Sequence, residues 1–443
     1  MLQSGIVVLI LLSCTYGENP AVQVVLTDKG LQYGKHAATD WIQERLEMIT
    51  FPDISGDVDI LIGTVDYTLT GITIKKCDIP EPSVEFLQDV PGFKASISGL
   101  CVALTGEWRT QFGIIHDGGT FDMAILNIDL TSVVQLGKED DGHLTVTSVS
   151  CDAQVGDVDI HFYGGGSFFF NPFVSHFKGK IIDEIQKRLC PGVEENINSV
   201  ESHLHAMNVS FDVNEVLTLD LPLTAVPMIG ASSMNLGLKG EFYNIKTHKE
   251  PPYEAQPFTM PDAPSYMLSV GMSDFTLNTA SYGYYSDNLL QLLVNDSMIP
   301  SISPVRLNTT SMGKYIPQLA KMYPDMLMNV LVYARDAPMV STQPDAVKVI
   351  IKAAAKASAI HPNGTQIPLF TLNAVSSLDS ENSLMSAFCP SFPDMCFSVA
   401  EKLGAGFVVL RMKYAELVNS VLSMEEVSIC KRTHIRTNVW LFG

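Results

Sequence analysis

Few residues in this chain have the types and spacing that catalysis requires. The sequence contains no GxSxG nucleophile elbow, no GKS or GKT phosphate loop, no HExxH helix and no CxxC pair. Residues 164–166 are three glycines, but no loop and lysine follow them, so they indicate a flexible turn. Because no nucleophile, base and orienting group can be assembled, we expect a protein that is not an enzyme, and we predict no catalytic residue.

Two small clusters have residue types that could bind a metal ion or act as paired carboxylates. Glu201 and His205 stand four residues apart on a predicted helix, with His203 between them. Without a second cluster, a solvated helix end is the better interpretation. Residues 139–141 (EDD) fall at a hairpin turn, where solvated charges are the better interpretation. We therefore predict no metal site and no cofactor.

The composition excludes several classes of protein. The chain has 443 residues, 46% of them apolar, which suffices for two or three folding units with large cores. Lys and Arg number 28 against 48 Asp and Glu, a formal charge of −20. A nucleic-acid partner is not expected, because phosphate contacts need clustered basic side chains. Residues 18–240 contain 13 basic and 31 acidic residues, and residues 241–443 contain 15 and 17, so the halves have different surfaces.

Residues 1–17 are predicted to be a signal peptide. The apolar run GIVVLILL is too short to span a bilayer, and the small residues Thr15 and Gly17 precede a cleavage site before Glu18. We therefore expect a secreted, extracellular protein. Four glycosylation sequons agree with this route and lie at Asn208, Asn295, Asn308 and Asn363.

Cysteine number leaves the oligomeric state open. Without Cys14, seven cysteines remain, and disulfides persist outside the cytosol. An odd number leaves at least one thiol free or paired between chains, so we expect a monomer or a disulfide-linked dimer. The seven are Cys77, Cys101, Cys151, Cys190, Cys389, Cys396 and Cys430.

Two helices and a long alternating stretch organise residues 18–240. Apolar residues at helical spacing predict an amphipathic helix of about 20 residues that Pro52 ends. A second helix is predicted after Pro172, kinked or interrupted by Pro191. Between them, residues 65–162 alternate between apolar and polar, which predicts a twisted antiparallel sheet with one buried face.

The second half is predicted to be a separate unit of related design. Residues 241–264 include the proline-rich run PPYEAQPFTMPDAP and are assigned as an extended linker to a unit at 265–443. Early in that unit, SDFTLNTASYGYYSDNLLQLL has the outline of TDKGLQYGKHAATDWIQERL near the start of the chain. One unit therefore looks as if it were used twice.

The excess apolar surface has two interpretations. On sequence physics alone, a large ordinary core is favoured. The alternative is a lipid cavity, because each CH₂ removed from water gains about 0.8 kcal/mol and two acyl chains gain on the order of 20 kcal/mol before costs. The candidate lining residues, each with a competing role as core, are Trp41, Ile42, Leu46, Phe177, Ile181 and Ile185 for a first groove and Phe275, Leu277 and Leu289 for a second.

The segment 238–261, LKGEFYNIKTHKEPPYEAQPFTMP, resembles the centre of the bactericidal/permeability-increasing protein family. This family also contains the lipopolysaccharide-binding protein and the plasma phospholipid and cholesteryl ester transfer proteins. The likeness extends through ENPAVQVVLTDKGLQY, FPDISGDVDI and ISGLCVALTGEW in the first half. In the second half it includes MSDFTLNTA, NDSMIP, KYIPQLAKMYPDM and STQPDAV.

The resemblance implies an α+β fold. The expected architecture is a boomerang of two barrels of highly twisted antiparallel sheet, each with long amphipathic helices and a bound phospholipid, joined by a central sheet. It also implies a disulfide between Cys151 and Cys190. The family's lipopolysaccharide binders have lysines at the tip of the first barrel, whereas here only Arg109 is basic, so we expect an acidic tip. Trp108 is predicted to be either membrane-facing at this tip or a core aromatic.

The C-terminus departs from the family pattern. The likeness fades after Leu378, so the second barrel is expected to be incomplete or the end of the chain to be a variant product. A local Cys389–Cys396 bond would leave Cys430 as the odd thiol.

These observations and the resemblance together predict a secreted lipid-binding protein of innate defence against Gram-negative bacteria, most like the bactericidal and lipopolysaccharide-binding branch. The expected partners are lipopolysaccharide or phospholipid, whose acyl chains enter apolar grooves, and a bacterial or lipoprotein membrane surface. One alternative is a phospholipid transfer protein without endotoxin activity, which the acidity fits better. The other is a structural or signalling protein whose barrels hold no ligand.

Overall fold

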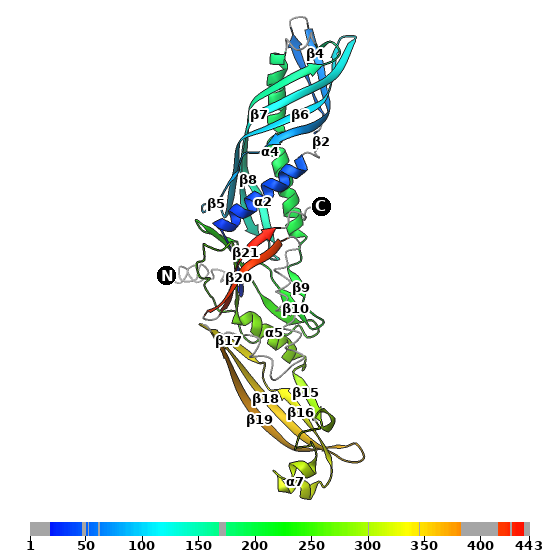
Figure 1. Cartoon of the computed structure of the whole chain (residues 1–443), viewed down its shortest axis with the longest axis vertical. Coiled ribbons are helices and arrows are strands. Elements are labelled where there is room, and N and C mark those ends of the chain that lie inside the picture. The colour runs from blue at the N-terminus through cyan, green and yellow to red at the C-terminus, as the bar shows by residue number, and fades with distance from the viewer. Residues whose placement is uncertain are drawn as a thin grey trace, which may run out of the picture.

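The computed structural model describes residues 18–46, 50–51, 53–60, 63–167, 174–299, 301–344, 346–381, 415–425 and 428–437. They form an elongated molecule with one curled antiparallel sheet at each end and a six-stranded sheet between them (Figure 1). This is the two-barrel architecture with a central sheet that the family resemblance implies, with each barrel present as a curled half-barrel.

The first sheet is built from long strands whose residues alternate between buried and exposed. It runs in the order β2-β4-β6-β7-β8, with β3 beside β4 and β5 beside β6. On one face the apolar side chains form a continuous core that includes Leu69, Phe121 and Val158. The strands are β2 (Thr50–Phe51), β3 (Ile54–Ile60), β4 (Gly63–Asp78), β5 (Ser83–Leu87), β6 (Gly92–Phe112), β7 (Ile115–Lys138) and β8 (Leu144–Tyr163).

Two helices accompany this sheet, as predicted. The helix α2 (Asp28–Leu46) follows β1, and α4 (Val174–His205) lies along the sheet (Figure 1). Pro191 does not interrupt α4, which has 32 residues in total and continues past the proline to His205. The Cys151–Cys190 disulfide, which the resemblance implies, is present and ties β8 to α4 with a sequence separation of 39.

The second sheet is smaller and has shorter helices. Its order is β15-β16-β18-β17, with β19 on the other edge of β18. The helix α5 (Asp274–Ser286) has only 13 residues, so it is shorter than the first half's helices. The strands are β15 (Gln291–Asn295), β16 (Leu327–Ala334), β17 (Met339–Gln343), β18 (Ala346–Ile360) and β19 (Gln366–Glu381). The short helical segments are η2 (Asp296–Met298), α6 (Thr309–Met312) and α7 (Pro317–Met322).

The central sheet joins both halves through one antiparallel pair. β1 (Val22–Thr27) pairs with β14 (Leu268–Ser273) in a register that places Val24 opposite Val270. Each strand leads directly into a helix that begins with an acidic residue, Asp28 in α2 and Asp274 in α5. The repeated sequence outline therefore corresponds to a repeated strand–helix unit, and the two copies meet at the centre.

The remaining central strands come from distant parts of the chain. The sheet order is β11-β12-β1-β14-β21-β20, so the last two strands lie beside β14. The assignment of 265–443 to the second barrel therefore needs correction, because its final described strands complete the central sheet. The strands are β11 (Met228–Ile229), β12 (Ser233–Leu238), β20 (Ala415–Glu425) and β21 (Ser428–Thr437), and a separate small sheet contains β9 (Ser210–Asp212), β10 (Leu217–Asp220) and β13 (Glu241–Asn244).

The proline-rich segment is extended and runs beside β1. After β13 ends at Asn244, residues 245–264 form no helix or strand. The side chain of Gln23 donates a hydrogen bond to the carbonyl of Phe258 at 2.7 Å, and Asn19 donates to Ala255 at 3.0 Å. The linker is therefore fixed against the central sheet.

The disulfide yields a prediction about stability. Substituting Cys151→Ser together with Cys190→Ser releases a loop with a sequence separation of 39. In the chain-entropy model this lowers the free energy of unfolding by about 4 kcal/mol. Urea denaturation followed by tryptophan fluorescence measures the loss. The control is Cys101→Ser, because Cys101 is a free, half-buried thiol. A loss below about 1 kcal/mol would contradict the prediction.

Candidate lipid-binding pocket

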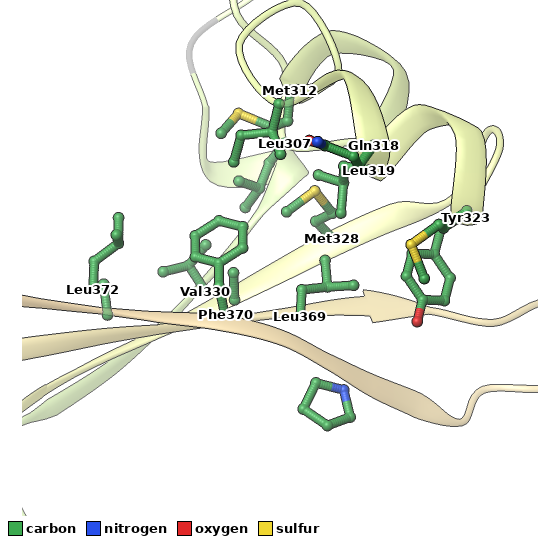
Figure 2. Close-up of a pocket in the computed structure, with 15 residues that line it drawn as sticks. Leu307, Met312, Gln318, Leu319, Tyr323, Met328, Val330, Leu369, Phe370 and Leu372 are labelled. Carbon is green, nitrogen blue, oxygen red and sulfur yellow. The ribbon is translucent and has the colours of Figure 1, made fainter.

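A largely apolar pocket lies in the second half, between the sheet and the short helices α6 and α7. Its volume is about 620 Å³, within the range of small-molecule sites. Figure 2 shows side chains of β19 facing those of the helical segment across the space. The lining residues are Leu307, Met312, Ile316, Gln318, Leu319, Met322, Tyr323, Met328, Val330, Ala355, Ala357, Pro368, Leu369, Phe370 and Leu372.

The pocket exists because one face of β18 changes composition along the strand. At the end nearer the centre, this face has Val347, Val349 and Ile351, which are buried in a small cluster that Leu277 joins. Towards the tip, the same face continues with alanines, of which Ala355 and Ala357 line the pocket. Because an alanine side chain reaches only one carbon above the sheet, the space over this part stays open.

The helical segment forms the opposite wall. Leu319 of α7 is 6% exposed and packs with Met328 of β16 and Ala357 of β18. Gly313 lets α6 and α7 approach closely, because a Cβ there would lie 2.5 Å from the Cβ of Ala320. The wall is thus held by a few close contacts.

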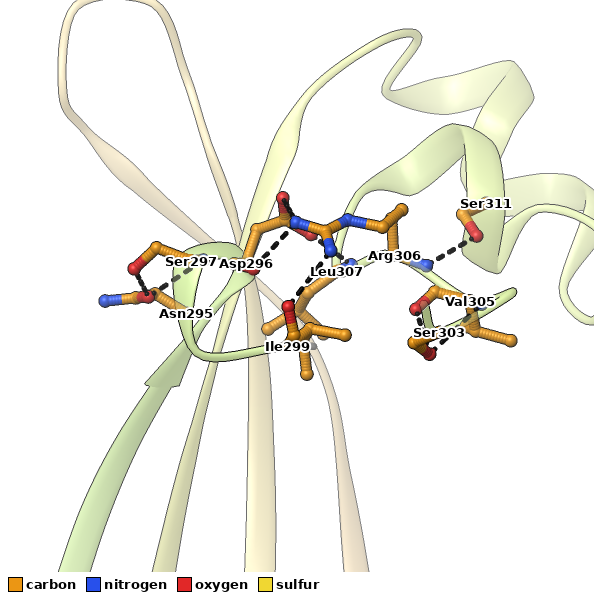
Figure 3. A network of polar contacts seen from close by, with 9 residues as sticks. All are labelled: Asn295, Asp296, Ser297, Ile299, Ser303, Val305, Arg306, Leu307 and Ser311. Carbon is orange, nitrogen blue, oxygen red and sulfur yellow. Dashed lines mark hydrogen bonds and ion pairs between the residues drawn. The ribbon is translucent and has the colours of Figure 1, made fainter. Parts of the chain in front are cut away.

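A polar network fixes the loop that leads into this wall (Figure 3). The Arg306 guanidinium donates to a carboxylate oxygen of Asp296 at 2.6 Å and to the carbonyl of Ile299 at 3.0 Å. The other carboxylate oxygen of Asp296 accepts from the backbone N–H of Leu307, a lining residue, at 2.7 Å. The hydrogen bond from Arg306 lowers the pKa of Asp296 from its ordinary value of 3.8. The carboxylate therefore remains charged and keeps Leu307 in place.

The pocket is open to solvent at a rim of apolar side chains, and two lysines lie close to lining residues in the sequence. Met322 and Leu372 line the pocket and are 67% and 60% exposed. Tyr315, next to lining residue Ile316, is 68% exposed. The exposed Lys314 and Lys321 lie on the same short segment. A ligand with an apolar tail and a negatively charged head would match this arrangement.

A second cavity of about 1220 Å³ lies where the linker meets α5, and its lining is mixed. Phe275 is part of it, together with the carboxylates of Glu241, Glu254 and Asp274. Burial raises the pKa of Asp274, although its carboxylate accepts hydrogen bonds from Thr342. Such an acidic lining suits an acyl chain less well than the first pocket does. Within the described ranges, no helix combines the length and apolar character needed to cross a bilayer.

The structure describes the side chains of only part of the predicted first groove. The backbone of Trp41, Ile42 and Leu46 belongs to α2 and that of Phe177 to α4, but their side chains lie outside the described part of the structure. Ile181 is fully buried in the core under α4, and Ile185 packs at the edge of that core. Ile181 is therefore a core residue.

The three residues predicted for the second groove do not come together. Phe275 packs with Ala21 and Ala255, whereas Leu277 packs on the valine cluster of β17 and β18. Leu289 is 44% exposed after the end of α5. None of the three lines the apolar pocket, which lies nearer the tip than expected. The alanines of AAAKASA in β18 were the missed signal, because small residues recur there on one face of a strand.

Of the two alternatives for Trp108, the structure supports the core aromatic and not the membrane-facing residue. Its side chain is 1% exposed, and its indole N–H donates to the carbonyl of Tyr163 at 3.1 Å. Its ring packs edge-on against Phe162. Arg109, the next residue, points outward and lies 3.8 Å from Glu107. The exposed apolar side chain in the turn after β6 is Ile114, 96% exposed.

The described sequons and thiols have mixed surroundings. Asn208 and Asn363 are exposed, while Asn295 and Asn308 are half-buried and accept hydrogen bonds from backbone N–H groups two and three residues on. Cys430 is fully buried in β21, with its Sγ 3.8 Å from the sulfur of Met260. It is therefore not placed to form a dimer disulfide. Cys77 and Cys101 form no disulfide within the described residues, and Cys389 and Cys396 lie outside them.

Comparison with known proteins matches both halves to one family. The model described as "LBP / BPI / CETP family, N-terminal domain" matches residues 30–207, and that of the C-terminal domain matches 211–387. The bactericidal permeability-increasing protein of Sebastes schlegelii is 35% identical over 372 residues, 84% of this chain and 78% of that protein. The lipopolysaccharide-binding protein of Mus musculus is 28% identical over 367 residues, 82% of this chain and 76% of that protein.

A solved structure shares the fold. The crystal structure of lipopolysaccharide binding protein superposes with a TM-score of 0.57 at 22% identity, covering 95% of this chain and 99% of that one. The two family domains follow one another along the chain in the order of its two curled sheets. The chain therefore belongs to the LBP / BPI / CETP family, whose members bind lipid and are not enzymes.

Proposed function

We propose that this protein is secreted and acts in innate defence against Gram-negative bacteria by binding the acyl chains of lipopolysaccharide or phospholipid. The observation that supports this most directly is the apolar pocket between α6–α7 and the sheet of β16, β18 and β19. Among its exposed lining residues, Met322 and Leu372 would give an acyl chain a route from a membrane surface into the pocket. Removing about six methylenes from water would gain about 5 kcal/mol before costs.

The head group of the lipid is assigned to the two lysines near the rim of the pocket. Lys314 and Lys321 are exposed beside the residues that line the pocket. An ammonium group attracts a lipid phosphate, and each contributes about 1 kcal/mol near an anionic surface. The acyl chain would enter the pocket while the lipid phosphate stays at the side chains of these two lysines.

The charges at the tip of the first half favour phospholipid over lipopolysaccharide as the ligand, and this gives a second candidate function. At its tip, Arg109 is beside Glu107, and β3 adds the exposed Asp57 and Asp59. Lipid A phosphates would be repelled by this group of carboxylates. A phospholipid transfer protein without endotoxin activity is therefore the alternative, and zwitterionic vesicles compared with lipopolysaccharide distinguish the two.

Filling the pocket should remove lipid from the protein. Ala355→Phe places an aromatic ring in the space that Ala355 leaves open. We therefore expect lipid binding to weaken tenfold to hundredfold, because the ligand would lose the burial of about two to three methylenes. Native mass spectrometry of the purified protein and displacement of a fluorescent fatty acyl probe measure the change. Lys356→Phe, which adds the same ring on the exposed face of β18, should bind normally. Absence of lipid from the wild-type protein would refute the proposed function.

The two rim lysines should govern the charge preference of binding. Lys314→Gln with Lys321→Gln should weaken binding to vesicles containing anionic phospholipid by about 25-fold at low salt, roughly fivefold for each residue. Binding to zwitterionic vesicles should change little. Vesicle co-sedimentation at 20 and 200 mM salt tests this, with Lys356→Gln as the matched control. Equal losses on both vesicle types would contradict a phosphate contact.

The loop network should lose its order at acid pH. Because folding lowers the pKa of Asp296, the unfolded chain binds more protons near its ordinary pKa of 3.8. The stabilisation is therefore complete above that value and decreases as the pH falls towards the lowered pKa. Amide hydrogen exchange should show that the protection of residues 296–307 decreases as the pH falls through this acidic range. The measured rates are first corrected for the intrinsic pH dependence of exchange. In Asp296→Asn this segment should exchange faster at neutral pH and depend little on pH, whereas Asp325→Asn should resemble the wild type.

A further inference from the structure

Three ligand-type side chains that are far apart in the sequence meet where the β7–β8 hairpin contacts the end of α4. Glu139 follows β7, His143 precedes β8, and His205 is the last residue of α4. One ligand atom from each lies within 4.8 Å of the others. Glu139 Oε2 is 3.0 Å from His205 Nδ1, and the two imidazole rings are 5.5 Å apart.

The hydrogen bonding of His143 fixes which of its nitrogens could bind a metal ion. Its Nε2 lies 2.7 Å from the carbonyl oxygen of Met207. A carbonyl only accepts hydrogen bonds, so Nε2 bears the proton. In the neutral imidazole, Nδ1 then presents a lone pair. A backbone carbonyl that fixes the outer nitrogen of a histidine in this way is typical of metal-binding histidines.

The Nδ1 atom of His143 faces negative charge. Nδ1 is buried, no hydrogen-bond donor of the described structure reaches it, and a carboxylate oxygen of Asp141 lies 2.8 Å away. When no metal ion is bound, a proton on Nδ1 supplies the positive charge between these two atoms, and a bound cation would take its place. The carboxylate of Glu139 adds to the negative potential.

The backbone holds Glu139 and His143 together without the ion. Glu139 and His143 face each other across the turn, where the N–H of Glu139 donates to the carbonyl of His143 at 2.9 Å. Gly142 turns with a φ of +90°, and its carbonyl accepts from the N–H of Leu223 at 2.8 Å. A Cβ on Gly142 would lie 2.3 Å from Pro222, so the turn is pressed against the connection to the central sheet.

We propose that Glu139, His143 and His205 form a Zn²⁺ site, with the Asp141 carboxylate or a water molecule as the fourth ligand. Two imidazole nitrogens and a carboxylate are a ligand set that zinc prefers, whereas Ca²⁺ and Mg²⁺ prefer oxygen alone. The ion fastens the β7–β8 hairpin to the end of α4. Its role is structural, and it does not depend on the apolar pocket near the tip of the second half.

Titration calorimetry of the full chain with ZnCl₂ tests the site. We expect one Zn²⁺ per chain, and on the order of 5 °C higher melting temperature at a hundredfold excess over Kd. His143→Ala and His205→Ala should each weaken binding at least about 100-fold. His203→Ala is the matched control, because His203 bonds to the carbonyl of Ser199 on its own helix. MgCl₂ and CaCl₂ should give no saturable heat.

Two further results keep the proposal falsifiable if a variant folds poorly. The side chain of His205 is 63% exposed, so His205→Gln should retain the wild-type circular dichroism spectrum while losing Zn²⁺. Co²⁺ added to the wild type should show the intense visible absorption of tetrahedral coordination, and this should vanish in His205→Gln. Binding that is unchanged in both His143→Ala and His205→Gln, or no wild-type binding below about 100 μM, would overturn the proposal.

Discussion

The antiparallel pairing of β1 with β14 is the constraint on which the rest of the molecule depends. Both strands continue directly into a helix that starts with an acidic residue. Because paired antiparallel strands point in opposite directions, the elements that follow them extend to opposite ends. The proline-rich segment contacts β1 and connects the two halves. The elongated shape in Figure 1, with one curled sheet at each end, follows from this single pairing.

Side-chain size along the strands then decides where the interior is filled. Under α4 the first sheet presents large residues such as Trp108 and Phe121, which pack with Ile181 of α4 into a continuous core. In the second sheet, β18 has β-branched residues near the centre and alanines near the tip. Since protein interiors are close-packed wherever side chains can reach, a run of alanines facing helices held at a distance leaves usable space. The apolar pocket of this chain therefore results from a local change of residue size along one strand.

Much of the fold could be predicted from the sequence, because its signals are periodic. The apolar spacing of α2 and α4, the alternation in β4 to β8 and the repeated strand–helix outline all lie within continuous segments. The sites could not be predicted in this way. Trp108 and Arg109 differ in exposure only because successive residues of a strand face opposite sides. Glu139 and His205 are brought together by tertiary structure alone, so spacing along the chain indicated only solvated charges.

The final hairpin, β20–β21, has a role that its position in the sequence conceals. It lies against β14, on the side that β1 does not use, so it covers backbone N–H and C=O groups that would otherwise be exposed. An open sheet edge of this kind is a template for pairing with another molecule. A shortened product that ended before Ala415 would keep both curled sheets and the lipid pocket, yet would expose this edge. Such a product would tend to associate with itself, and solubility would be lost before ligand binding.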